Sequence, residues 1–184
     1  MLTIANFRKE QYNIHKPFVE VAMSIVKFYR DDPNAPKPNM PAHLGTNAII
    51  IWDDKLLLER RRDSDTWGLI GGGVKNYETE SQALLREIYE ELGLRVHKTD
   101  LHKLSVYGEP GRIAAYQDGS IWRMVIVVFG LVFSEKPELM ISKESKDLRF
   151  FSKEEIDKLD IVVTHSDIVQ NWFCENTWWK LVKM

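Results

Sequence analysis

Apolar residues dominate two short segments in the first half of the chain, residues 48–52 and 55–59. Asp53 and Asp54 separate them, so the pattern predicts two strands joined by a tight turn. Residues 121–133 form the most apolar segment, and β-branched and aromatic side chains dominate it. Because such a run is typical of a strand covered on both faces, we expect this segment to be the central strand of a sheet.

The last part of the chain combines a short strand with helical periodicity. Residues 148–151 are expected to be extended, and Ser152 with Glu155 three positions later predicts the start of a helix over residues 153–159. A second helix is expected over residues 164–179, with the aromatic residues Trp172, Phe173, Trp178 and Trp179. Because no basic residues are interleaved with these side chains, we interpret them as a lid on the core and not as a base-stacking platform.

The N-terminal part of the chain is less informative. Residues 18–29 fit either an alternating strand or an amphipathic helix, and periodicity leaves both open. Residues 31–41 contain four prolines and predict a linker or a long exposed turn. We therefore divide the chain into an N-terminal extension with a proline-rich linker, residues 1–41, and a main domain over residues 42–184.

The segment from Gly72 to Leu94 combines a glycine turn with a short acidic helix. Thr79 and Gln82 form a capping-box pattern and Gly93 is placed as a C-terminal stop, which predicts a helix over residues 80–92. At about 100° per residue the helix has two unlike faces. The apolar face carries Leu84, Leu85, Ile88 and Leu92, and the opposite face displays Glu87, Glu90 and Glu91.

The three carboxylates on this helix would repel one another, and Arg86 can offset only part of the repulsion. A divalent cation would neutralise the rest, since carboxylate oxygens are hard ligands suited to Mg²⁺ or Mn²⁺. A glycine turn beside them can bring a backbone carbonyl or a substrate phosphate close. The cluster therefore indicates a metal-assisted phosphate site, and the alternative is a solvated acidic helix face.

The spacing of the whole segment decides between these alternatives. Gly72 is followed after five residues by Glu78 and after seven more by the run REIYEELGL, which starts at Arg86. This pattern resembles the Nudix box at every specified position. The resemblance extends more loosely over residues 42–152, although Ile70 stands where many family members have proline before the glycines.

The resemblance implies an α/β fold, a Nudix-like α/β/α sandwich with a mixed sheet between helices. It also implies hydrolysis of a diphosphate linked to another group, with Mg²⁺ or Mn²⁺ as the cofactor. By motif position, the metal ligands would be Glu87, Glu90, Glu91 and the carbonyl of Gly72. Glu78 and Arg86 would support the site by orienting the loop and the helix, which Gly93 ends.

Two further sets of residues outside the box are candidates. Arg60, Arg61 and Arg62 lead toward the glycine turn, where a guanidinium could bind a phosphate with two hydrogen bonds. Surface arginines on a strand edge are an equal alternative. Family members often recruit one more glutamate from a late loop, and Glu144 is the candidate for a second metal or for the proton of the attacking water. The alternative for Glu144 is a solvated loop residue.

The substrate is less clear from the sequence than the reaction. Pro110 lies sixteen residues after Leu94, which is similar to a pointer seen in ADP-ribose pyrophosphatases of the Nudix family. ADP-ribose or a nucleotide sugar is therefore the first choice. The alternatives are a housecleaning nucleoside triphosphate pyrophosphatase and a non-catalytic Nudix-like ligand-sensing module. All box carboxylates are intact, which favours an enzyme.

Composition and charge narrow the partners and the compartment. The net charge of −2 over 184 residues gives no basic field for nucleic acid, so a small phosphorylated nucleotide is the expected partner. No apolar run reaches membrane length and no signal-peptide core is present, so a cytoplasmic protein is expected. A homodimer is left open. The histidines show no metal-ligand spacing, and we expect each to be structural or exposed: His15, His43, His97, His102 and His165.

Overall fold

The computed structural model describes residues 26–175. In chain order the elements are β1 (Val26–Arg30), β2 (His43–Trp52), β3 (Lys55–Arg61), β4 (Trp67–Gly68), β5 (Ile70–Gly73), α1 (Glu80–Leu92), the 3₁₀ turn η1 (Lys98–Asp100), β6 (His102–Tyr107), β7 (Arg112–Tyr116), β8 (Ile121–Phe133), β9 (Ser145–Phe151), α2 (Lys153–Ile156) and α3 (Val163–Glu175). The expected C-terminal helix is confirmed as far as residue 175, and Trp178 and Trp179 lie outside the described residues.

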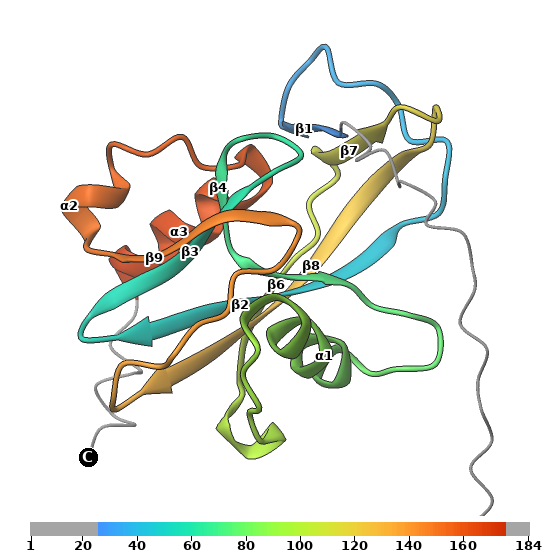
Figure 1. Cartoon of the computed structure of the whole chain (residues 1–184). Helices are drawn as coiled ribbons and strands as arrows, with labels where there is room; N and C mark the ends of the chain where they lie inside the picture. Colours follow the sequence, from blue (N-terminus) through green and yellow to red (C-terminus); the bar gives the residue numbers. More distant parts are fainter. Residues whose placement is uncertain (1–25, 176–184) are drawn as a thin grey trace, which may run out of the picture.

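The nine strands in the described part of the chain form one mixed sheet. β2 and β8 are parallel neighbours, whereas the other strand pairs are antiparallel. β8 pairs with β2, β6 and β7, which confirms residues 121–133 as the central strand (Figure 1). The long β8 therefore connects the main part of the sheet with the smaller ladder of β7 and β1.

The two faces of the sheet are covered by different helices. Alternate side chains of β2 point to opposite faces, as the strand geometry requires. Ala48 and Ile50 pack in a core with Leu84, Ile88 and Leu92 of α1. Ile49 and Ile51 pack in a second core with Ile168, Val169 and Trp172 of α3. Figure 1 shows α1 and α3 on opposite sides of the sheet, so the expected α/β/α sandwich is confirmed.

The helix α1 begins and ends as the sequence predicts. The Thr79 hydroxyl accepts a hydrogen bond from the backbone N–H of Gln82, and the Gln82 side-chain oxygen accepts one from the backbone N–H of Thr79. Gly93 ends the helix in the left-handed conformation with φ 71°. The expectation that all three glutamates are displayed to solvent was wrong for Glu91, which is only 5% exposed. Because Glu91 follows Ile88 by three positions, it lies at the border of the packed face.

Other local predictions hold with different boundaries. Asp53 and Asp54 both have positive φ, 50° and 57°, as a two-residue hairpin turn between β2 and β3 requires. The expected strand over residues 148–151 is longer and starts at Ser145. The expected helix over residues 153–159 is shorter, since α2 ends at Ile156, although Ser152 caps it as predicted. Trp67, which precedes the glycines of β5, packs edge-on against Phe151 with ring centroids 4.7 Å apart.

The strand β1 settles part of the ambiguity near the N-terminus. Residues 26–29 are extended and pair with β7, whereas residues 18–25 lie outside the described part of the chain. Residues 31–41 contain no regular element and are mostly exposed, as expected of a proline-rich connection. Among the described residues, no helix is long and apolar enough to cross a membrane.

Candidate active site

The glycine strand β5 pairs with β2 in the sheet and contacts α1, and its backbone approaches its neighbours closely. The Asn47 side chain donates hydrogen bonds of 3.3 Å to the carbonyls of Leu69 and Ile70, which fixes the entry into β5. Gly71 has φ 144°, and a Cβ there would collide with the Thr46 carbonyl. The N–H of Gly71 donates to Glu91 at 3.1 Å. Glycine at this position therefore brings β5 into direct contact with the acidic helix.

Gly72 is the second point of close approach. A Cβ at Gly72 would collide with the carboxylate of Glu87, so only glycine leaves room for that side chain. Thr46 pairs with Gly72 across the strands, and its buried hydroxyl has no hydrogen-bond partner among the described residues. The structure thus places a backbone segment, two carboxylates and an unsatisfied hydroxyl next to one another.

Arg86 ties the loop after β5 to the helix. Its Nε and one terminal nitrogen donate to Glu78 at 3.1 and 2.7 Å, and the same terminal nitrogen donates to the Gly73 carbonyl at 3.1 Å. The other terminal nitrogen donates to Glu87 at 2.6 Å and to Glu90 at 3.1 Å. The hydrogen bonds from Arg86 lower the pKa of Glu78 to about 2. Because the guanidinium is rigid, it fixes the loop relative to the carboxylates.

The carboxylates beside β5 carry unfavourable negative charge. Burial raises the pKa of Glu91 well above its ordinary value, and the neighbouring charges of Glu59 and Glu87 raise it further. Burial also raises the pKa of Glu87, despite its ion pair with Arg86. A cavity of about 240 Å³ opens here, and its lining includes Glu87, Glu90, Glu91 and Glu144. The four box and loop glutamates expected from the sequence therefore face one cavity.

Glu59 is a member of this cluster that the sequence interpretation missed. It is only 2% exposed, accepts a hydrogen bond of 2.8 Å from the Ser145 hydroxyl and lies 3.2 Å from Arg61. The pairing of β3 with β9 shifts register between Arg60 and Arg61, so that Ser145 pairs with Arg61 and Lys146 is skipped. A charged residue directly after three buried leucines was the signal that could have revealed Glu59.

The three consecutive arginines separate in the structure. Arg61 forms ion pairs with Asp63 at 2.6 Å and with Glu59 at 3.2 Å, and it lines a second cavity on the other side of β5. Burial opposes its charge, but these carboxylates raise the pKa of Arg61 overall. Arg60 is exposed and pairs with Asp65, and the exposed Arg62 contributes a backbone hydrogen bond to the Glu144 carbonyl. The structure brings only Arg61 to the candidate site.

The second cavity has a volume of about 130 Å³ and lies on the α3 side of β5. It is lined by the glycines of β5 together with Phe28, His43, Asn47, Arg61, Tyr116 and His165. The ring of His43 meets Trp122 edge-on at 5.5 Å. The cavity residues come from seven separate segments of the chain, so sequence spacing contains no sign of their proximity.

His165 is the most deeply placed titratable group in this cavity. Its Nδ1 accepts a hydrogen bond of 3.1 Å from the N–H of Leu69. Burial, followed by the positive charges of Arg61 and Arg112, lowers the pKa of His165 to about 3. Our expectation of structural or exposed histidines therefore misses that His43 and His165 both line a cavity.

The residues around Gly72 fit a divalent cation. Among the described residues, no three His, Cys, Asp or Glu side chains are already arranged to hold a metal ion, and Arg86 contacts two of the candidate carboxylates. The available donors are carboxylate and carbonyl oxygens, which Mg²⁺ and Mn²⁺ prefer. Burial raises the pKa values of Glu87 and Glu91 and so disfavours their charged forms, which a bound cation would stabilise.

Comparison with known proteins gives a family match and several relatives. A family model described as the NUDIX domain matches residues 41–172. The nucleoside triphosphatase NudI of Enterobacter sp. (strain 638) is 31% identical over 97 residues, which cover 52% of this chain and 67% of the relative. The ADP-ribose pyrophosphatase of Methanocaldococcus jannaschii is 31% identical over 132 residues, which cover 70% of this chain and 72% of the relative.

A solved structure shares the fold. The bifunctional NMN adenylyltransferase/ADP ribose pyrophosphatase from Francisella tularensis superimposes with a TM-score of 0.60 at 22% sequence identity. The match covers 75% of this chain but only 42% of that protein, so this chain corresponds to less than half of it.

Proposed function

Since the chain belongs to the Nudix hydrolases, which act on diphosphate bonds, we propose that its substrate is a nucleoside diphosphate linked to another moiety. ADP-ribose or a nucleotide sugar is the first choice. The ADP-ribose pyrophosphatase of Methanocaldococcus jannaschii supports this choice, because its match with this chain covers 72% of the relative.

The observation that carries the proposal is the position of β5 between two unlike cavities. Gly71 and Gly72 contact Glu91 and Glu87 on the α1 side, and the same glycines line the cavity on the α3 side. One cavity offers carboxylates, and the other offers aromatic rings and a guanidinium. A substrate with a charged diphosphate and an uncharged organic group matches this arrangement.

The residues divide the chemical work as follows. Glu87, Glu90, Glu91 and the Gly72 carbonyl would hold Mg²⁺ or Mn²⁺, which when bound would neutralise charge on the phosphate oxygens. Arg86 and Glu78 hold the loop and α1 in register. Arg61 donates to a phosphate oxygen from a terminal nitrogen of its guanidinium, which Asp63 and Glu59 hold in place. Glu144 reaches into the carboxylate cavity from its loop and accepts the proton of the attacking water.

A nucleoside triphosphate pyrophosphatase is the second candidate. The observation in its favour is the similarity to the nucleoside triphosphatase NudI, which is as close in identity as the ADP-ribose pyrophosphatase. Both reactions need the same carboxylates and the same arginine, so the two candidates differ in what occupies the α3-side cavity and where the diphosphate is cut.

A substrate panel tests the proposal. The purified chain with millimolar Mg²⁺ is incubated with ADP-ribose, nucleotide sugars, dinucleoside polyphosphates and nucleoside triphosphates, and the products are separated by chromatography. We expect kcat/KM for ADP-ribose or a nucleotide sugar to exceed that for every nucleoside triphosphate by at least about tenfold, or about 1.4 kcal/mol. A tenfold preference for a triphosphate would establish the second candidate instead.

The metal requirement is tested by melting curves. At ten times its dissociation constant, Mg²⁺ would stabilise the fold by about 1.4 kcal/mol and raise Tm by roughly 3–6 °C. An unchanged Tm over a millimolar titration would contradict the proposed metal site. The domain boundary after residue 41, a cytoplasmic location and a homodimer stay predictions.

A further inference from the structure

The strand β1 lies outside the segment that matches the NUDIX family model, yet it forms part of the α3-side cavity. The match begins at residue 41, whereas β1 spans Val26–Arg30. Phe28 of this strand lines the cavity together with Tyr116 of β7. Figure 1 shows β1 beside β7, where the two strands form the small ladder at the end of β8. The wall of the cavity is therefore completed by a segment outside the matched domain.

The register of β1 and β7 explains why Phe28 faces the cavity. Val26 pairs with Tyr116, Phe28 with Ala114 and Arg30 with Arg112. Residues that are directly paired or two apart share a face of the ladder, so these six side chains share one face. The ends of that face differ, because Phe28 and Tyr116 open onto the cavity while the two arginines contact α3.

The arginine end of the ladder is fastened to α3. Asp167 accepts hydrogen bonds from Arg30 at 3.2 Å and from Arg112 at 2.6 Å. Arg112 is fully buried and also donates to the Thr164 carbonyl. Because buried, charged hydrogen bonds are among the stronger contacts in proteins, this end holds β1 at a fixed distance from α3. Phe28 lies two residues from this anchor and is a fixed wall of the cavity.

Phe28 also borders the arginine that the proposed function uses. The Arg61 guanidinium carbon lies 6.0 Å from the centre of the Phe28 ring, within range of a cation–π contact. The cavity volume of about 130 Å³ is below the roughly 300–1,000 Å³ of typical ligand pockets. It therefore has room for one group of a nucleotide, and a change in a single wall residue changes what fits.

We propose that Phe28 is a specificity-determining residue, with its ring as the wall against which the substrate's organic group packs. This inference rests on the proposed function, because it assumes that the organic group of the substrate binds in this cavity. It goes further in two ways. It assigns recognition of the substrate to Phe28, which precedes the matched domain, and it specifies that the organic group next to the diphosphate is flat or ring-shaped.

Three variants test the assignment. Phe28→Ala removes the wall and Phe28→Trp narrows the cavity, whereas Tyr29→Ala removes an aromatic ring from the next position, whose side chain is not in the lining of the cavity. Calorimetry in EDTA measures ADP binding to each variant, so the readout needs neither metal nor turnover. Steady-state kinetics with the best substrate of the panel then separates KM from kcat.

For Phe28→Ala we expect the dissociation constant of ADP and the KM to rise about tenfold, with kcat within about twofold, which is the scale of losing one ring partner of a base. Phe28→Trp is expected to shift the preference among panel substrates toward smaller organic groups. Tyr29→Ala should leave both constants within about twofold. If Phe28→Ala does not fold, ADP affinity and KM are measured instead for Phe28→Trp and for the milder substitution Phe28→Leu.

The outcomes separate this inference from the proposed function. Wild-type protein that binds ADP but hydrolyses no panel compound would refute the proposed function, and the Phe28 variants would still decide the inference through ADP affinity. ADP affinity within twofold of wild type in every Phe28 variant would overturn the inference, as would equal effects of Phe28→Ala and Tyr29→Ala. Wild-type protein without ADP affinity would overturn it as well.

Discussion

The two sides of β5 differ in the sign of the charge they tolerate. On the α1 side, burial raises the pKa values of Glu59, Glu87 and Glu91, so the site favours extra positive charge. On the α3 side, burial and two arginines lower the pKa of His165, so that cavity disfavours an extra proton. The α1 side is therefore suited to a cation, and the α3 side to a group without positive charge.

This difference has a cost in stability on one side only. Carboxylates buried near one another destabilise a fold unless they are paired, because both desolvation and repulsion act against them. Glu59 pairs with Arg61, and Glu87 pairs with Arg86, but among the described residues Glu91 accepts a hydrogen bond only from the Gly71 N–H. The unfavourable charge concentrates on Glu91, where binding of a cation would gain most. Variants that remove charge on one side should therefore act differently from variants on the other.

The largest expected effect is on Glu91. Glu91→Gln keeps an oxygen that can accept the Gly71 N–H but removes the charge, so kcat is expected to fall by about a hundredfold or more. At the same time, Tm without metal should stay equal or rise, because repulsion with Glu59 and Glu87 is relieved. The measurements are steady-state kinetics and a melting curve in EDTA.

Glu80→Gln is the matched control for this prediction. Glu80 lies on the same helix, one turn or more from the cluster, and pairs with Lys103 at the surface. It should retain wild-type turnover. A Glu91→Gln variant with turnover within threefold of wild type would show that the buried carboxylate has no part in the reaction.

The second prediction concerns His165, on the opposite side of β5. Its pKa is about 3 in the folded protein and 6.5 in an ordinary histidine. Between these values the unfolded chain binds a proton that the folded chain rejects, so stability is lost as pH falls below 6.5. The loss from this residue reaches about 2 kcal/mol at pH 5. Chemical denaturation at several pH values measures it.

His165→Asn isolates this contribution, since the asparagine oxygen can still accept the Leu69 N–H but does not titrate. The buried glutamates have raised pKa values and stabilise the fold as pH falls, so only the difference between wild type and variant is informative. That difference should decrease with falling pH. Parallel stability curves for the two proteins would contradict a neutral, buried His165.

The third prediction separates neighbouring arginines. Arg61→Lys keeps a positive charge beside Glu59 and Asp63 but loses the forked geometry, so kcat/KM should fall about tenfold, the scale of one charged hydrogen bond. Arg60→Lys, on the exposed side of the same strand, should change it by less than twofold. Melting curves verify that both variants are folded. Equal effects would mean that phosphate binding does not depend on the position of Arg61.

These residues also show how far the sequence could be interpreted. The apolar run in β2 and the caps of α1 predicted elements well, because apolar runs, helical periodicity and cap geometry are local properties. The acidic box was visible because its members lie within one short segment. Phe28, His43 and His165 were not predictable, since they meet only through the pairing of β1 with β7 and the docking of α3. The spacing of residues along the chain does not reveal which distant residues meet in the folded protein.

For two groups of residues, the local sequence pattern and the tertiary contacts lead to different conclusions. Helical periodicity placed Glu91 on the solvent face, but contact with Gly71 buries it. The three consecutive arginines were equivalent candidates in the sequence. Only Arg61 lines the cavity, and the register shift between β3 and β9 occurs at this residue. In both cases, tertiary contacts decided between positions that the sequence could not rank.

The smallest expected effect concerns Glu144, which borders the carboxylate cavity from a loop. Its N–H donates to the Ser142 hydroxyl at 3.1 Å and its carbonyl accepts from Arg62 at 2.9 Å, so the backbone is held while the exposed side chain can move. Glu144 lines the same cavity as Glu87, and after burial, the main cause, its charge adds to the raised pKa values of Glu59 and Glu87. A mobile carboxylate at this position can accept a proton from water beside the diphosphate.

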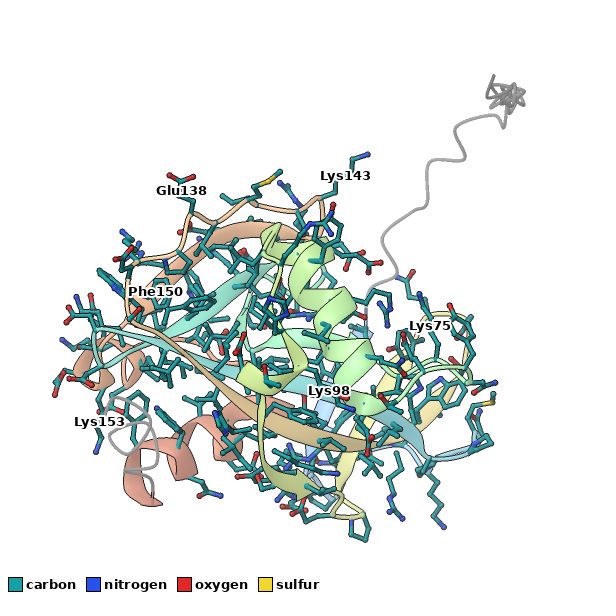
Figure 2. The ribbon with its side chains drawn as sticks, turned by 90° about the horizontal axis from the view of Figure 1, so that it is seen from below. Lys75, Lys98, Glu138, Lys143, Phe150 and Lys153 are labelled. Carbon is teal, nitrogen blue, oxygen red and sulfur yellow. The ribbon has the colours of Figure 1, made fainter. Side chains whose placement is uncertain are left out.

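Glu138 provides the matched control, because it is an exposed glutamate that precedes Glu144 on the same connection between β8 and β9. Figure 2 shows Glu138 farther from α1 than Lys143, the neighbour of Glu144. Glu144→Gln is expected to lower kcat severalfold and Glu138→Gln to leave it unchanged, as measured with saturating substrate and Mg²⁺. Because water itself can carry protons away, the loss should be smaller than for Glu91→Gln. Equal, small effects of the two substitutions would assign Glu144 to the solvent and leave proton acceptance to another carboxylate of the cavity.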